Sequence, residues 1–404
     1  MLIQKAFKYR LRVNAETDHQ LRRMTGCRRF VWNSGLSAIK AALASGKKRP
    51  GYKQLCAALL ETKRQYPFLA TDAPAQALQQ TLKDLDRAVK DAFDVKQPLK
   101  GFPAFKKKGK SVESFRIPQG FEIDQNNTRI KLPKLGWLRY RNSREITGSP
   151  KNVTINLHGG HWYASVQTEQ EVVEPVHMST TAIGGDRGIN SFLAVSDGTL
   201  VQPINAFAQM KRKLARLQRQ LARKVKFSEN WKKAKQKIAR IHSKIAAMRK
   251  DYIHKLSTTI ANNHSTVVLE DLKVKNMSAS AKGTTEAPGR NVKQKSGLNR
   301  SILDQGWGEF ALQLEYKLRW LGGTLIKMPP AYTSQKCSCC GHTEAGNRKN
   351  QKFTCLSCGF ELHADINAAK NILAAGLAVI ACGEHLDVTG SMKQEPTEGA
   401  YAFA

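Results

Sequence analysis

Four cysteines near the C-terminal end of the sequence have the spacing of a zinc site. They form two Cys-x2-Cys pairs, Cys337 with Cys340 and Cys355 with Cys358. Four thiolates at this spacing can bind one Zn²⁺ ion tetrahedrally and close its coordination shell. Cys339 offers a second pairing in the first motif, but glycine follows Cys340 as it follows Cys358, and glycine suits a tight knuckle turn. We therefore expect one structural zinc ion bound by Cys337, Cys340, Cys355 and Cys358.

Three carboxylates stand where secondary-structure elements are expected to begin or end. Asp186 follows an apolar strand and lies between glycines, Glu270 closes the apolar run 266–270, and Asp365 opens a helix-like run. Folding could gather them into one cluster whose repulsion divalent cations would neutralise. Mg²⁺ prefers such hard oxygen ligands, and two ions about 3.5–4 Å apart can hold the attacking and leaving oxygens of a phosphodiester. The pattern indicates a site for phosphodiester cleavage with two magnesium ions.

Each of these carboxylates also has a purely structural interpretation. Asp186 could form a surface ion pair with the neighbouring Arg187, and Glu270 could be a solvated strand end. Asp365 could cap a helix, because Asp is favoured at the first position before a helix. Position in the sequence alone does not decide between these interpretations and catalysis.

The charge of the chain indicates its partner. The 404 residues include 66 Lys and Arg against 32 Asp and Glu, a formal net charge of +34. So large an excess repels itself unless a polyanion shares the surface, and each phosphate contact with nucleic acid releases counterions. We expect a nucleic-acid-binding protein. The basic residues predicted to contact phosphates are Lys106, Lys107, Lys108, Lys232, Lys233 and Arg348.

Composition argues against several other classes of protein. Apolar residues make up 41% of the chain, which is typical of a globular protein. No apolar run is expected to reach the roughly 18 residues of a membrane-spanning helix, and the charged N-terminal residues do not form a signal peptide. We expect a cytoplasmic protein without a membrane partner. Under reducing conditions the other cysteines are expected to be free thiols, namely Cys27, Cys56, Cys339 and Cys382.

Hydrophobic periodicity predicts the elements that position these residues. In the first half, we expect a strand at 2–13, helices over 15–100 with a stop at Tyr66-Pro67, and short strands over 112–172 with a hairpin at Gly159-Gly160. This order predicts a small β-barrel with a helical insertion. In the second half, we expect two strands within 182–199, long basic helices over 205–260, a buried strand at 266–270, a mobile loop at 279–299, a helix at 304–321, a strand at 323–328 and a helix from 365 to about 375.

Motifs spread over residues 1 to about 376 resemble those of TnpB, the OrfB-type proteins of bacterial insertion sequences. In chain order they are Phe30-Val-Trp-Asn, Gly101-Phe-Pro-Ala-Phe-Lys-Lys-Lys, Leu132-Pro-Lys-Leu-Gly, Gly184-Gly-Asp-Arg-Gly-Ile, Leu269-Glu-Asp-Leu, Gln305-Gly-Trp-Gly-Glu-Phe, Thr333-Ser-Gln-Lys-Cys and Asp365-Ile-Asn-Ala-Ala-Lys-Asn-Ile. TnpB proteins are related to the type V CRISPR nucleases. Proteins of this family are also called transposases.

The resemblance implies an RNA-guided, Mg²⁺-dependent DNA endonuclease that cuts by a two-metal RuvC mechanism. Asp186, Glu270 and Asp365 would be its catalytic, magnesium-binding carboxylates. It implies a guide RNA from the right end of the transposon and a double-stranded DNA target, whose sequence is chosen by base pairing. We expect a monomer with its RNA in the bacterial cytoplasm, associated with the nucleoid when bound to DNA. A nuclease-inactive DNA-binding or regulatory protein and a transposase proper are the alternatives, and the retention of all three carboxylates favours cleavage.

The resemblance also implies a multidomain α+β fold. A wedge-like β-barrel would comprise residues 1–14 and 112–175, with a helical recognition lobe inserted at 15–111. A RuvC α/β domain of RNase H type would comprise 176–328 and 361–382, with a zinc ribbon inserted at 329–360. Residues 383–404 would form a flexible tail.

Overall fold

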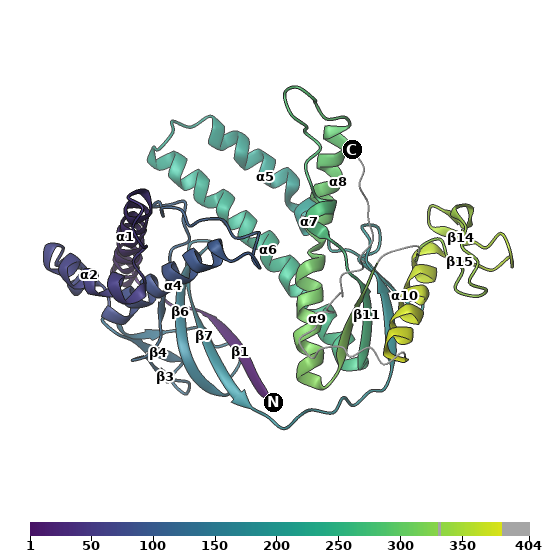
Figure 1. The fold of residues 1–404 in the computed structure, drawn as a ribbon, viewed down its shortest axis with the longest axis horizontal. Coiled ribbons are helices and arrows are strands. Elements are labelled where there is room, and N and C mark those ends of the chain that lie inside the picture. The colour runs from purple at the N-terminus through teal and green to yellow at the C-terminus, as the bar shows by residue number, and fades with distance from the viewer. Residues whose placement is uncertain (330–332, 382–404) are drawn as a thin grey trace. The chain divides into compact units, whose positions relative to one another are not determined.

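The computed structural model describes residues 1–329 and 333–381, and its elements are labelled in Figure 1. The chain divides into two compact units, Met1–Val173 and Glu174–Ala404. The boundary falls beside Pro175, in the polar stretch that links the strand-rich part of the sequence to the rest. Cys382 and the predicted tail at 383–404 lie outside the described residues.

The larger sheet of the first unit is antiparallel and has the order β1-β7-β6-β2. β1 (Leu2–Arg10) pairs along its whole length with β7 (His161–Glu171). β7 pairs in turn with β6 (Ser149–His158), and β6 with β2 (Ser114–Ile117). The N-terminal strand therefore joins strands that are far away in the sequence, and the predicted hairpin between β6 and β7 is confirmed.

The smaller sheet of the first unit consists of β3 (Glu122–Asp124), β4 (Arg129–Leu132) and β5 (Gly136–Arg139). A single bridge pairs Leu11, just after β1, with Tyr140, just after β5. Apolar side chains from both sheets share one core. The described strands of this unit thus form two sheets over a common core, with helices inserted between β1 and β2 as the sequence predicts.

The helical insertion packs around a core of its own. It comprises α1 (Ala15–Ala44), α2 (Tyr52–Gln65), α3 (Phe68–Asp72) and α4 (Ala75–Phe93). Asn14 caps α1 by accepting a hydrogen bond from the backbone N–H of Thr17, as Asn favours at this position. Leucines spaced three or four residues apart on α4 face α1. The predicted helices over 15–100 are confirmed, and α2 ends just before the predicted stop at Tyr66-Pro67.

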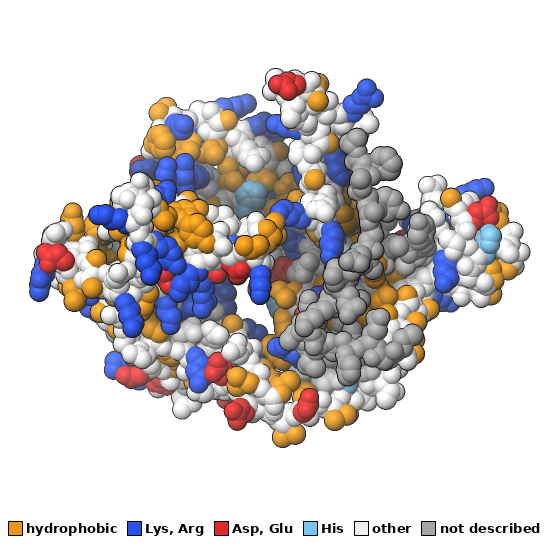
Figure 2. Space-filling model, viewed as in Figure 1, with side chains coloured by type: hydrophobic (Ala, Val, Ile, Leu, Met, Phe, Trp, Pro, Cys, Tyr) orange, Lys and Arg blue, Asp and Glu red, His pale blue; other side chains and the backbone are white. Residues whose placement is uncertain are grey.

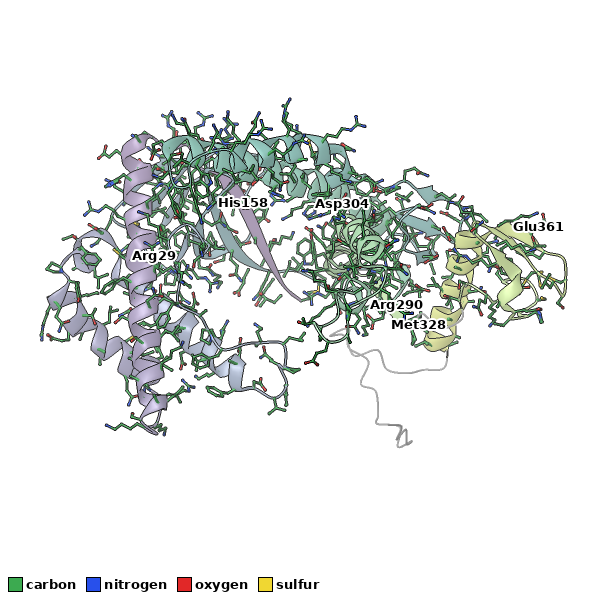
Figure 3. All side chains as sticks on the ribbon, turned by 90° about the horizontal axis from the view of Figure 1, so that it is seen from above. Arg29, His158, Arg290, Asp304, Met328 and Glu361 are labelled. Atoms are coloured by element: carbon green, nitrogen blue, oxygen red, sulfur yellow. The ribbon has the colours of Figure 1, made fainter. Side chains whose placement is uncertain are left out.

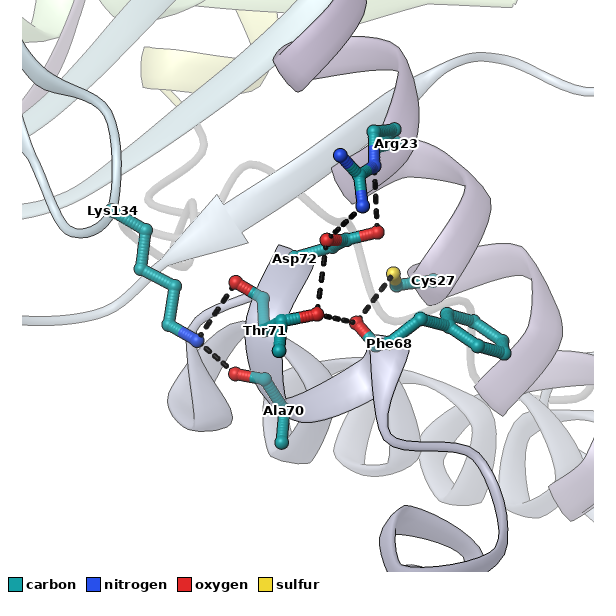
Figure 4. A network of polar contacts seen from close by, with 7 residues as sticks. All are labelled: Arg23, Cys27, Phe68, Ala70, Thr71, Asp72 and Lys134. Atoms are coloured by element: carbon teal, nitrogen blue, oxygen red, sulfur yellow. Dashed lines mark hydrogen bonds and ion pairs between the residues drawn. The ribbon is translucent and has the colours of Figure 1, made fainter.

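The short helix α3 is held by polar contacts that Figure 4 shows from close by. Arg23 on α1 donates two hydrogen bonds to the Asp72 carboxylate, at 2.7 and 2.5 Å. Lys134, in the turn between β4 and β5, donates to the carbonyl oxygens of Ala70 and Thr71. The contacts of Lys134 tie the helical insertion to the smaller sheet, and the Arg23 pair ties α3 to α1.

The second unit contains a five-stranded sheet with the order β10-β9-β8-β11-β12. β8 (Ala182–Asp186), β11 (Thr266–Glu270) and β12 (Thr324–Met328) are parallel. β9 (Leu193–Val195) is antiparallel to β8, and β10 (Leu200–Val201) is antiparallel to β9. Because β8 and β11 are parallel neighbours, their carboxyl ends lie at the same edge of the sheet.

Helices complete the second unit. α5 (Ala206–Ala222) and α6 (Glu229–Asn263) are the predicted basic helices, and Ser228 caps α6 by accepting from the backbone N–H of Trp231. α9 (Trp307–Leu321) packs on α6. Gly306, with φ of 75°, separates α9 from α8 (Val292–Gln305).

The structure corrects two predictions in this region. α8 occupies the second half of the predicted loop 279–299, and the helix predicted at 304–321 is divided at Gly306. Polar composition concealed α8, whose first turns are held by long-range contacts. Lys295 Nζ donates to the carbonyl oxygen of Met277 at 2.8 Å, and the Asn299 amide donates to that of Ser278 at 3.0 Å.

The short helix α7 (Val274–Met277) follows β11. The last described helix, α10 (Ala364–Ala381), packs on β8. It is longer than predicted, and by length and composition it could cross a membrane, which corrects the expectation that no apolar run is long enough. A core helix passes the same test, and 44% of this segment is buried. A Cβ atom on Gly184 in β8 would lie 2.2 Å from the carbonyl oxygen of Ala369, so the two backbones touch.

Candidate active site and metal centre

The four predicted zinc ligands form one cluster. The Sγ atoms of Cys337, Cys340, Cys355 and Cys358 all lie within 4.8 Å of one another. Two of the Sγ–Sγ distances are 3.6 and 3.8 Å. A tetrahedral zinc ion with Zn–S bonds of about 2.3 Å requires sulfur separations of about 3.8 Å. The cluster therefore has the size and the donor set of a structural zinc site.

Two knuckle turns bring these thiols together. The backbone N–H of Gly341 donates to the carbonyl oxygen of Cys337 at 3.0 Å, and that of Gly359 donates to Cys355 at 2.9 Å. Both glycines have positive φ, 80° and 73°, which favours glycine at these positions. The prediction that glycine identifies Cys340 as the ligand is confirmed, because the cluster contains Cys340 and not Cys339.

A small three-stranded sheet supports the cluster. It consists of β13 (Arg348–Lys349), β14 (Lys352–Thr354) and β15 (Glu361–His363). Phe353 is fully buried and packs with Cys337 and Cys355. Backbone N–H groups, that of Cys358 foremost, lower the pKa of the Cys355 thiol, which favours the thiolate that a metal binds. The backbone N–H of Phe360 acts in the same way on Cys358, but hydrogen bonds to the other thiols outweigh it and raise the pKa of Cys358.

The three predicted carboxylates lie on elements that pack together. Asp186 ends β8, Glu270 ends the parallel neighbour β11, and Asp365 is the second residue of α10. Burial, and after it the negative charges of Glu270 and Asp365, raise the pKa of Asp186 to about 7. Glu270 is itself only 8% exposed. Folding thus gathers residues that are about 80 and 180 positions apart in the sequence into one electrostatic neighbourhood.

The carboxylates do not form a ready coordination shell. Among residues 1–329 and 333–381, the four cysteines are the only group whose ligand atoms all lie within 4.8 Å. Two carboxylates instead contact other side chains. Glu270 Oε1 accepts a hydrogen bond from Thr333 Oγ1 at 2.7 Å, and Asp365 Oδ1 accepts one from Arg348 Nη2 at 2.8 Å. A cation at this site would compete with these two partners for the carboxylate oxygens.

Arg187 has a different role from the surface ion pair that was the structural alternative for Asp186. It is 8% exposed and donates hydrogen bonds to the backbone carbonyl oxygens of Glu270 and Trp307. Burial lowers the pKa of Arg187 to about 10, and Asp186 and Glu270 act in the opposite direction. Its Nε atom has no hydrogen-bond partner in the described part of the chain. Arg187 therefore clamps the end of β11, a role that its place beside Asp186 in the sequence does not reveal.

The basic residues predicted to contact phosphates lie in different surroundings. Lys106 is partly buried, with Nζ 3.5 Å from the ring centre of Trp32, whereas Lys107 and Lys108 are exposed. At the start of α6, Lys232 pairs with Glu229 at 2.6 Å and Lys233 is exposed. Arg348 pairs with Asp365. Figure 2 shows Lys and Arg side chains spread widely over the visible face.

Three family models match this sequence. A model described as "Probable transposase", for OrfB proteins of IS605 elements, matches residues 165–281. A Cas12f1-like TNB domain matches residues 307–372, which include the four-cysteine cluster, and a helix-turn-helix domain matches residues 1–48. These matches define the class of the protein as OrfB-type, which is the class that its sequence motifs resemble.

Comparison with individual proteins establishes the family. An Escherichia coli (strain K12) protein named "Putative RNA-guided DNA endonuclease InsQ" is 52% identical over 403 residues, which cover 99% of each chain. A Streptomyces pristinaespiralis protein named "Putative RNA-guided DNA endonuclease" is 34% identical, over 98% of this chain and 96% of its own. The solved structure of the mini-RNA-guided endonuclease CRISPR-Cas_phi3 is 11% identical with a TM-score of 0.43, over 98% of this chain and 94% of its own. The chain belongs to the TnpB family of OrfB-type proteins.

Proposed function

We propose that this protein is an RNA-guided, Mg²⁺-dependent endonuclease that cuts double-stranded DNA. The observation that carries the proposal is that Asp186, Glu270 and Asp365 come from three distant elements yet share one electrostatic neighbourhood. The names of its relatives support an RNA guide and a DNA target. The guide would come from the right end of the insertion sequence, and the protein would act as a monomer with its RNA in the bacterial cytoplasm and on the nucleoid.

The topology of the second unit supports a RuvC domain of RNase H type. An antiparallel β8–β9–β10 meander followed by parallel β11 and β12 places two carboxylates at one sheet edge. We propose that this domain comprises 176–328 and 361–382 and carries the zinc ribbon 329–360 as an insertion, with β15 extending the ribbon sheet to His363. In the first unit, residues 1–14 and 112–175 would form the wedge-like barrel and 15–111 the recognition lobe.

The buried carboxylates fit a magnesium site by their chemistry. Asp186 loses hydration on folding and is repelled by two neighbouring carboxylates, so a cation would stabilise its ionised form. When bound there, two magnesium ions would supply an activated water and stabilise the leaving oxygen. Asp186, Glu270 and Asp365 would hold them, while Arg187 fixes the backbone of Glu270. Thr333 and Arg348 hold two of the carboxylates at defined positions. The four thiolates would hold one zinc ion with a structural role.

A cleavage assay with the protein's own RNA tests this function. The RNA that copurifies with the full-length chain is sequenced, and DNA complementary to its guide segment is the substrate, with Mg²⁺ present. We expect Asp186→Asn to lower the cutting rate by at least about 10³-fold because a metal ligand is lost, while RNA binding remains. The matched control is Asp197→Asn, since Asp197 is an exposed turn carboxylate that accepts a hydrogen bond from the Thr199 backbone N–H.

The outcomes separate the proposed function from its alternatives. Cutting by Asp186→Asn at the normal rate would show that the metal assignment is wrong. A wild-type protein that binds RNA and target without cutting would be a regulatory DNA-binding protein. Strand joining by the purified protein without a partner recombinase would identify a transposase.

A further inference from the structure

In the first unit, the loop after the helical insertion is fastened to α1 by two side chains. Trp32 Nε1 donates a hydrogen bond to the carbonyl oxygen of Ala104 at 3.1 Å. The Asn33 amide pairs with the backbone of Lys106, donating to its carbonyl oxygen at 3.0 Å and accepting from its N–H at 2.8 Å. These bonds fix the backbone of residues 104–106 against α1, and so fix the point from which the Lys106 side chain extends.

Three cations converge beside this loop. Arg28, Arg29 and Lys106 line one pocket, together with Ser111 and the carboxylate of Glu113. Arg29, labelled in Figure 3, extends from α1. Arg28 is part of the frame, because its Nη1 donates to the carbonyl oxygen and to Oγ of Ser114 in β2, at 2.6 and 3.1 Å. The pocket is therefore built from a helix, a loop and a strand that are held together by hydrogen bonds.

The three cations of this pocket outnumber its one carboxylate, that of Glu113. In residues 1–329 and 333–381, no ion pair within 4.0 Å joins Arg28, Arg29 or Lys106 to a carboxylate. Glu113 is shared with Arg22, at 3.5 Å. Asp84 acts on Arg28 and Lys106 only through a longer-range charge interaction. Burial lowers the pKa of Lys106 to about 8, and a desolvated cation of this kind is stabilised when an anion joins it.

We propose that this pocket binds one phosphodiester group of a nucleic-acid strand, with Arg29 and Lys106 as the contacting cations. Ser111 would add a neutral donor, because its Oγ accepts from the backbone N–H of Lys107 at 2.9 Å and leaves the hydroxyl hydrogen free. A phosphate suits the pocket because guanidinium groups bind its oxygens in a fixed geometry. A base does not, because the Trp32 ring is 8% exposed and already covered by Lys106. The proposal rests on the proposed function for its choice of nucleic acid as partner.

Phosphate ethylation interference locates such a contact. The probes are the RNA that copurifies with the protein and, in a second arm, the DNA duplex that carries its target. Arg29→Gln/Lys106→Gln is compared with the matched control Lys47→Gln/Lys48→Gln, which removes two exposed charges from the loop after α1. In the wild type and the control, ethylation of one or two adjacent phosphates should weaken binding. In the pocket variant this interference should disappear, and the slope of log affinity against log salt should fall by about 0.7–0.9.

Each result of this experiment either assigns the bound phosphate to one nucleic acid or overturns the proposal. Loss of interference in the RNA arm assigns the phosphate to the guide, and loss in the DNA arm assigns it to the target. Wild-type interference retained by the pocket variant in both arms overturns the proposal. Arg29→Gln alone serves as a second variant, since Arg29 makes no hydrogen bond in the described structure and its loss should leave the fold intact. Because the readout is binding, cleavage is not needed, and a chain that binds neither probe would overturn the proposed function itself.

Discussion

The two candidate metal centres of the second unit are assembled in opposite ways. The four thiols of the zinc site already lie within 4.8 Å of one another. Two of the three carboxylates of the proposed magnesium site instead contact other side chains, Glu270 with Thr333 and Asp365 with Arg348. The zinc site therefore has the geometry for its ion before the ion binds. The proposed magnesium site has carboxylates that repel one another, and a cation would relieve this repulsion.

The difference follows from the distance in sequence over which each site is built. Each zinc-binding pair lies in one knuckle, closed by a single backbone hydrogen bond and a glycine with positive φ. The carboxylates depend on the parallel pairing of β8 with β11 and on the packing of α10 against β8. Local turns can place ligands without help, whereas long-range packing brings like charges together at a cost that a cation must offset.

Loss of a zinc ligand should have the largest effect. Cys355→Ser should reduce the zinc content from one ion per chain to none and unfold the segment 337–363, because structural zinc supplies on the order of 10 kcal/mol. Metal analysis and limited proteolysis of this segment are the measurements. Cys339→Ser is the control, because Cys339 is exposed and outside the cluster. Zinc retained by Cys355→Ser, or lost from Cys339→Ser, would show that the ligand set is different.

A disturbance of the packing beneath the carboxylates should have the next largest effect. A Cβ atom on Gly184 would lie 2.2 Å from the carbonyl oxygen of Ala369 and 2.7 Å from the backbone nitrogen of Leu373. Since neither backbone atom can rotate away, Gly184→Ala should force β8 and α10 apart and destabilise the unit by about 3 kcal/mol. Thermal unfolding measures this loss, and the zinc content should remain at one ion per chain.

Gly297→Ala is the control for that substitution. Gly297 lies within α8, and a Cβ atom there would meet nothing within 4 Å. Alanine should therefore stabilise the helix by about 1 kcal/mol. Equal stability of the two variants would contradict the close approach of α10 to β8. Loss of zinc from Gly184→Ala would show that the two metal centres are not built independently.

The same contrast explains what the sequence could predict. The zinc ligands were predictable because motif, glycine and turn all lie within a few residues. The strands that carry Asp186 and Glu270 were predictable from apolar runs, and their parallel pairing is consistent with the long basic helices between them. The helical insertion was predictable because α1 and α4 repeat apolar residues at helical spacing.

The partners of these residues were not predictable, because they depend on contacts between distant elements. The sequence places Arg187 beside Asp186 but does not show that it is buried and bonded to the Glu270 backbone. It identifies Arg348 as basic, but the ion pair with Asp365 requires the ribbon to fold against the start of α10. α8 was missed because its polar surface gives no apolar period, and it is held by contacts to residues 277–279.

The free energy of unfolding should depend on pH because burial and the neighbouring carboxylates disfavour the ionised form of Asp186. The pKa of Asp186 is raised in the folded protein to about 7, so the folded state binds a proton more tightly than the unfolded state. Stability from this group is therefore full below the unfolded pKa, near 4, and is lost as the pH rises to about 7. Without added magnesium, Asp186→Asn should be more stable than the wild type at pH 8, by roughly 2–4 kcal/mol.

Denaturant unfolding at pH 5 and pH 8, with zinc retained, measures this difference. The advantage of Asp186→Asn should shrink at pH 5, where the wild-type carboxyl is largely protonated. Addition of Mg²⁺ at pH 8 should stabilise the wild type more than the variant, because only the wild type keeps the ligand. An advantage that is the same at both pH values would show that burial and its neighbours do not raise the pKa of Asp186.

The smallest expected effect concerns the cation that already contacts this site. Arg348 is one-third exposed and pairs with Asp365, so its guanidinium competes with a metal ion for the same carboxylate. Pairs of this exposure contribute up to about 1 kcal/mol, so Arg348→Met should raise the affinity for Mn²⁺ by up to about fivefold. Manganese is the probe because it prefers the same oxygen ligands and is paramagnetic, which allows free and bound ion to be counted.

Lys349→Met is the matched control, since Lys349 is exposed on the same short strand and makes no ion pair in the described residues. It removes one positive charge without releasing Asp365, so its Mn²⁺ affinity should change by less than about twofold. A lower affinity in Arg348→Met would mean that the arginine orients Asp365 for the metal rather than competing with it. The carboxylate site would then be partly preassembled by the ribbon, and the contrast between the two metal centres would be smaller than their apparent geometry indicates.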